Sequence, residues 1–85
     1  MTSTTQDSTA ATRSFLLRMG NAWLEQGELR QAVDVYLKII DQYSDSEESQ
    51  NAQTALLSVA QRYEQEGKLR LSLDILERLE QTQDA

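Results

Sequence analysis

The sequence predicts an all-α protein of four helices, folded as two antiparallel helix hairpins that stack as a short right-handed superhelix. The first observation is an internal repeat with an offset of 40 residues, marked by a lone glycine in each copy, Gly27 and Gly67. The second is composition: the chain has no proline and lacks the alternating β-branched runs that strands require. Repeats of roughly 20–50 residues are typical of stacked-repeat architectures. The residues of the first copy that recur identically in the second are Leu16, Leu17, Gly27, Leu29, Arg30 and Asp34.

The first hairpin is predicted from residue 10 onward. Residues 1–9 are rich in Thr, Ser and Gln, so we expect a disordered polar tail there. Apolar residues at helical spacing then include Phe15, Met19 and Trp23. Gly27 ends this helix, because glycine enters the left-handed conformation without a Cβ clash. The second helix begins almost at once at Leu29, and so short a turn makes the two helices antiparallel.

The second hairpin is predicted to begin after a Ser/Asp-rich turn at residues 44–48. Ser44 with Glu47, or Asp45 with Glu48, has the spacing of a capping box. The third helix is therefore expected over about residues 47–66. Gly67 repeats the turn, and an apolar fourth helix follows to about residue 83.

This layout resembles the tetratricopeptide repeat, a helix-turn-helix unit of about 34 residues with small and aromatic residues at set positions. Its signature falls first on Leu16, Met19, Gly20, Trp23, Ala32 and Tyr36, and then on Leu56, Val59, Ala60, Tyr63, Ser72 and Leu76. The small residues are expected where two helix backbones approach each other. Leucine replaces the first tryptophan of the signature in both units, and the usual terminal proline is missing.

The resemblance divides the chain into a tail, residues 1–9, and a two-repeat domain, residues 10–83. The repeats cover about residues 13–46 and 53–85, and residues 47–52 lengthen the third helix. In this family the first helix of each unit lines a concave groove that receives a partner peptide or helix. Carried over by position, the expected partner-binding residues are Ser14, Leu17, Arg18, Asn21, Leu24, Leu57, Ser58, Gln61 and Gln65.

Leu17 and Leu57 recur although neither belongs to the packing signature. They suggest an apolar strip in the groove, and packing inside the bundle is the alternative. Two units are fewer than such stacks usually need, so self-association, for instance as a homodimer, is a second expectation. Its expected contacts include Phe15 and Leu71. The end of the fourth helix is expected to be polar, because Glu77 and Glu80 replace apolar residues of the first unit.

The composition argues against catalysis and favours a role in binding another protein. The chain has neither cysteine nor histidine, so common nucleophiles, bases and zinc ligands are missing, and we expect no enzyme, metal or cofactor. A net charge of −6 disfavours nucleic acid, and no apolar run is long enough to span a membrane. We therefore expect a cytoplasmic protein-interaction module: an adaptor, assembly factor or accessory subunit. The alternative is a structural homo-oligomerisation domain that uses apolar faces at the ends of the stack.

Overall fold

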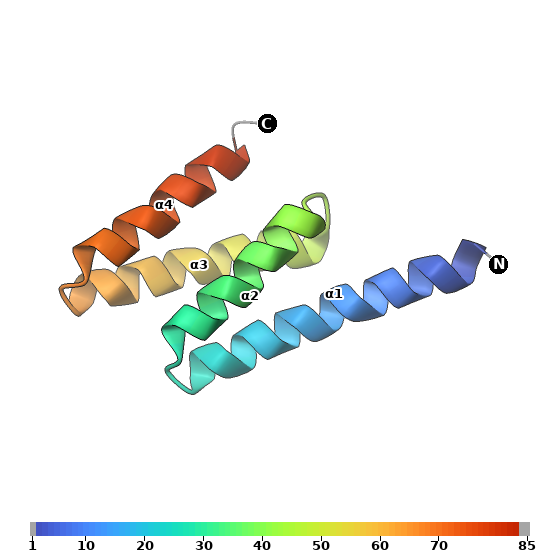
Figure 1. Ribbon diagram of the computed structural model, residues 1–85, viewed down its shortest axis with the longest axis horizontal. Helices are drawn as coiled ribbons and strands as arrows, with labels where there is room; N and C mark the ends of the chain where they lie inside the picture. Colours follow the sequence, from blue (N-terminus) through green and yellow to red (C-terminus); the bar gives the residue numbers. More distant parts are fainter. Residues whose placement is uncertain (1, 84–85) are drawn as a thin grey trace.

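Four helices follow one another in the computed structural model, which describes the backbone of residues 2–83 and the side chains of residues 8–82 (Figure 1). They are α1 (Thr2–Glu25), α2 (Leu29–Gln42), α3 (Glu47–Gln65) and α4 (Leu69–Gln83). α1 packs on α2, α3 packs on α4, and α3 also contacts both helices of the first pair. α1 and α3 run in one direction and α2 and α4 in the other (Figure 1). The prediction of an all-α fold built from successive helix hairpins is confirmed.

The two hairpin turns have the same geometry. Gly27 and Gly67 both have a φ of +80°, in the left-handed region that glycine tolerates. The amide of Glu28 donates to the carbonyl of Trp23 at 2.9 Å, and the amide of Lys68 donates to the carbonyl of Tyr63 at 2.8 Å. The amides of Gly27 and Gly67 donate to the carbonyls of Leu24 and Glu64, both at 3.0 Å. Each turn thus has the two hydrogen bonds of a Schellman motif. Each glycine therefore ends one helix while its neighbours start the next.

Ser46 caps α3, in place of Ser44 or Asp45, which the capping-box spacing favours. Its backbone is extended (ψ 160°), and its side-chain oxygen accepts a hydrogen bond from the amide of Ser49 at 3.0 Å. The hydroxyl of Ser46 also donates to the carbonyl of Tyr43 at 2.6 Å. The prediction of the capping residue is wrong because several consecutive side chains offer an acceptor, and only the backbone conformation selects one.

We expect Ser46→Ala to destabilise the domain by about 1 kcal/mol, because the amide of Ser49 loses its acceptor at the start of α3. Ser44→Ala is the matched control, since Ser44 is exposed and makes no cap. Urea unfolding followed by circular dichroism measures both values. Equal losses in the two variants would contradict the assignment of the cap.

The core lies on the two central helices. α2 and α3 supply most of the fully buried side chains, whereas α4 adds Ile75 and Leu79. Of the signature aromatics, Tyr36 and Tyr63 are buried and Trp23 is half-buried. The start of α3 belongs to this core as well, because Ser49 and Ala52 are completely buried. The residues that lengthen α3 are therefore packed against the rest of the fold.

Gly20 is required by a side chain rather than by a helix backbone. A Cβ placed on Gly20 would lie 2.8 Å from Cε1 of Tyr36, closer than real Cβ contacts. At this position the neighbour that requires a small residue is the ring of Tyr36, which fills the space between α1 and α2. In the second unit the corresponding pair is Ala60 and Leu76. Alanine is larger than glycine, and leucine is smaller than tyrosine, so the two differences compensate.

α1 begins at Thr2, so helix extends through most of the segment for which the composition predicts a disordered tail. These first turns project beyond the other three helices (Figure 1). Helical backbone without a packing partner is marginal for so short a segment, and the disorder of this tail in solution stays a prediction. Residues 1, 84 and 85, which the predicted tail and second repeat include, lie outside the described residues.

Candidate functional site

Most of the expected partner-binding residues are exposed on α1 and α3. Seven of the nine are exposed, and Leu17 and Leu24 are half-buried and pack against the core. The predicted apolar strip is therefore uneven. Leu57 is 47% exposed, whereas Leu17 at the matching position is partly covered. The two helices contact each other, so their exposed polar residues can form one surface.

Asn21 is held in place by the core of the first unit. The hydroxyl of Tyr36 donates to Oδ1 of Asn21 at 2.6 Å, while the ring of Tyr36 is completely buried. Burial raises the pKa of the Tyr36 hydroxyl, so this group stays protonated and remains a donor at neutral pH. The amide group of Asn21 is thus oriented at the surface with its NH₂ free to donate to a ligand.

Cationic groups of α1 lie close to aromatic rings. The Arg18 guanidinium lies 5.9 Å from the centre of the Phe15 ring, and Phe15 itself is 56% exposed. Arg13 lies equally far from the ring of Tyr43 and also donates to Glu48 of α3 at 3.1 Å. Cation–π contacts at exposed sites contribute only about 0.5–1 kcal/mol. Arg18 is therefore available to a partner at little cost, whereas Arg13 holds α1 against α3.

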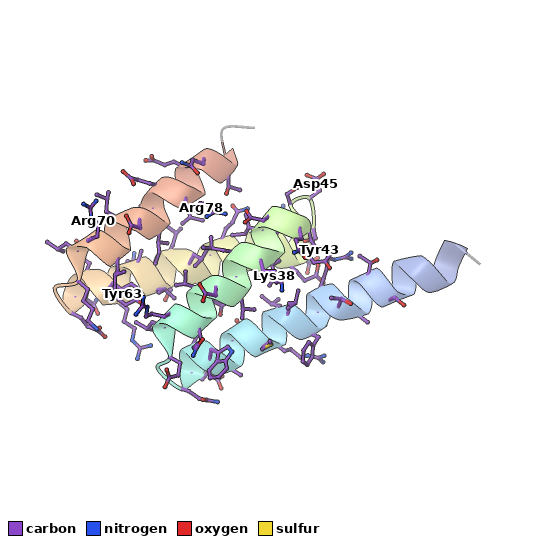
Figure 2. All side chains as sticks on the ribbon, viewed as in Figure 1. Lys38, Tyr43, Asp45, Tyr63, Arg70 and Arg78 are labelled. Atoms are coloured by element: carbon purple, nitrogen blue, oxygen red, sulfur yellow. The ribbon has the colours of Figure 1, made fainter. Side chains whose placement is uncertain are left out.

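A second ion pair links the hairpins on the other side. Arg78 of α4 donates to the carboxylate of Asp41 of α2. Figure 2 shows Arg78 on the side of α4 nearest to α2. Both groups are partly exposed, so this pair adds at most about 1 kcal/mol. Successive first helices and successive second helices are thus each joined by one charged contact.

A small hollow lies where the two hairpins meet, and the sequence analysis did not predict it. It has a volume of about 180 Å³, and Tyr63, Val33 and Leu71 form its apolar part. Burial raises the pKa of Tyr63; Glu66 and Asp34 add to the shift and Arg30 opposes it. Ligand pockets usually exceed about 300 Å³. This hollow is thus a packing feature between repeats, too small for a typical ligand.

Leu71 is an expected oligomer contact that the structure places differently. It is half-buried against the core and lines the hollow beside Tyr63. Leu71 is thus only partly exposed, because α4 turns this residue toward α2, and its role as an oligomer contact stays a prediction. The exposed leucines of α4 are Leu69, Leu73 and Leu76.

One comparison with known protein families finds a match to part of the chain. A family model described as tetratricopeptide repeat matches residues 15–46, which comprise most of the first hairpin and the turn before α3. The four-helix fold is consistent with two such units, since the second hairpin has the same turn and the same order of helices. No curated protein and no solved structure matches the chain.

The tetratricopeptide repeat indicates a protein–protein interaction module, and domains built from this repeat are typically non-catalytic. Within the part of the chain that the structure describes, no group of three or more acidic, histidine or cysteine residues is placed to hold a metal ion. None of the helices, as far as they are described, is long and apolar enough to cross a membrane.

Proposed function

We propose that the exposed surface shared by α1 and α3 binds a peptide segment or helix of another protein. In this role the chain acts as an adaptor, assembly factor or accessory subunit. The observation that carries the proposal is the position of the tetratricopeptide repeat together with the exposure of seven of the nine expected binding residues.

The chemistry of this surface suits a polar segment. Asn21, oriented by Tyr36, offers hydrogen-bond donors, and Arg18 offers a cation. On α3, Ser58 and Gln61 are exposed and add groups that both donate and accept. Backbone amides and carbonyls of an extended peptide need such partners. Leu57 supplies an apolar contact beside them.

The proposal is tested with Gln61→Arg, which places a long charged side chain on the α1/α3 surface without touching the core. Gln31→Arg is the matched control, because Gln31 is exposed at the start of α2, outside this surface. The wild type and both variants are tagged and used to capture partners from cells, and the captured proteins are quantified by mass spectrometry. We expect Gln61→Arg to lose at least about 1.4 kcal/mol of binding free energy, a tenfold loss of affinity, for proteins that Gln31→Arg retains.

Circular dichroism and thermal unfolding show that both variants are folded before the comparison is made. Loss of the same proteins by Gln31→Arg, or their full retention by Gln61→Arg, would exclude the α1/α3 surface as the binding site.

A further inference from the structure

Matched residues of the two hairpins differ sharply in exposure. Leu29 of α2 is 7% exposed, whereas Leu69, the same residue 40 positions later on α4, is 63% exposed. The residue type and its place in the hairpin are the same, so the difference comes from neighbouring helices. α3 packs on the first hairpin, and none of the described residues packs in the corresponding place on the second.

We call the uncovered surface of the second hairpin the tail face. It consists of Leu57, Leu69, Leu73 and Leu76. The three residues of α4 are spaced by four and three positions, so they form one stripe along the helix. Leu57 and Leu76 line a hollow of about 230 Å³ between α3 and α4. Glu77 and Glu80 are exposed, in agreement with the prediction of a polar end of the fourth helix, and the apolar stripe lies on the earlier turns of α4.

A second uncovered surface lies at the other end, on α1. Ala52 and Val59 of α3 are completely buried, whereas the matching residues of α1 are Thr12, which is exposed, and Met19, which is half-buried. Phe15 lies between them on the same side of α1 and is exposed. We call Thr12, Phe15 and Met19 the head face. It corresponds to the side of α3 that packs toward the first hairpin.

The internal contact between the hairpins is thus a template for a contact between molecules. Within one chain, α3 lies on the pair formed by α1 and α2. Between two copies, the head face on α1 of one molecule corresponds to the buried side of α3. The tail face on α3 and α4 of the other molecule corresponds to the surface of α1 and α2 on which α3 packs. We propose that this chain associates head to tail, with α1 of one copy docked on the tail face of another as α3 docks on the first hairpin.

Charge favours this arrangement over a symmetric tail-to-tail pair. Glu77 and Glu80 are exposed on α4 beside the tail face. Two tail faces brought together would place four carboxylates in one interface, and like charges in an interface cost several kcal/mol. The charged residues that flank Phe15 on α1 are Arg13, which is paired with Glu48 in its own chain, and Arg18, which makes no ion pair with any described residue. Arg18 beside a head face can therefore meet Glu77 or Glu80 beside the tail face with opposite charge.

Head-to-tail contact is heterologous, so it leaves one head face and one tail face free in every complex. The proposal therefore predicts a series of oligomers that grows with concentration, and not a closed dimer. It shares Leu57 and Arg18 with the proposed α1/α3 binding surface, but its test measures self-association of the purified chain, so the two proposals can fail separately.

The test uses the purified 85-residue chain and two variants that each block one face. Phe15→Glu blocks the head face, and Leu73→Glu blocks the tail face; both residues are about half exposed, so the core is left intact. Sedimentation velocity is measured over a concentration series in which the wild type grows beyond a dimer. We expect each variant alone to be a monomer. An equimolar mixture combines one free head face with one free tail face, so it should form a dimer and grow no further.

Gln31→Glu adds the same charge outside both faces and should associate as the wild type does, and circular dichroism shows that every variant is folded. A wild type that stays monomeric at all concentrations overturns the proposal. So does a mixture that stays monomeric, or a Phe15→Glu variant that still dimerises while Leu73→Glu does not, since the latter result means tail-to-tail pairing.

Discussion

Tyr36→Ala should destabilise the protein by about 3–5 kcal/mol, the range for removing a large aromatic ring from a core. Tyr36 is completely buried, and its ring occupies the space between α1 and α2 next to Gly20. Domains of this size are stable by only about 5–15 kcal/mol. We therefore expect partial or complete loss of helical circular dichroism at room temperature, and a large fall in the urea midpoint where folding remains.

The matched control is Leu76→Ala, because Leu76 has the same place in the second hairpin but is 39% exposed. Its cost should be less than half that of Tyr36→Ala, since much of the side chain is already in water. Tyr36→Phe keeps the ring and removes only the hydrogen bond to Asn21, which is expected to contribute about 1 kcal/mol. A tolerated Tyr36→Ala, or an equal loss at both matched positions, would contradict the burial that the structure gives Tyr36.

Gly20→Ala is the second large effect, and we expect a net loss of about 1–2 kcal/mol. The new Cβ would lie 2.8–3.2 Å from three atoms of the Tyr36 ring, and a buried ring has little room to move. Overpacking of this kind costs about 1–3 kcal/mol. Alanine offsets up to about 1 kcal/mol of that cost by favouring the helix. Urea unfolding of the single variant measures the balance.

The second hairpin supplies the compensating change. There the pair is Ala60 and Leu76, so Gly20→Ala combined with Tyr36→Leu copies a combination that the fold already accommodates. We expect the double variant to be more stable than the sum of the two single changes allows, by at least about 1 kcal/mol. Strict additivity in this double-mutant cycle would show that the ring and the glycine do not constrain each other.

Signals from residues close together in the sequence were sufficient to predict the two helix hairpins. Gly27 and Gly67 end helices because their φ of +80° is open to glycine at little cost, and that preference belongs to the residue itself. The helical spacing of apolar residues likewise predicts the core positions of α2 and α3. The sequence did not predict which of several neighbouring residues caps the third helix. Ser44, Asp45 and Ser46 all have side chains that can cap, and the path of the chain out of α2 decides which one does.

At the candidate site, too, some features were predictable from the sequence and others were not. The family signature predicts which side of α1 and α3 is polar and exposed, and most of those positions are exposed. It does not predict that Leu17 is partly covered while Leu57 is not, because the two leucines have the same place in their repeats. Asn21 also gains its orientation from Tyr36, a residue 15 positions away on another helix.

What the sequence determined by itself is a helical hairpin written twice, with its turns and its helical periods, because those depend on residues within a few positions of one another. Only the tertiary structure decided which matched apolar residues are covered. Leu29 is buried and Leu69 is exposed because α3 packs on the first hairpin, and none of the described residues does the same for the second. The burial of a side chain depends on neighbours that are distant in the chain. The sequence of a single repeat does not include those neighbours, so it cannot predict which of its apolar residues are covered.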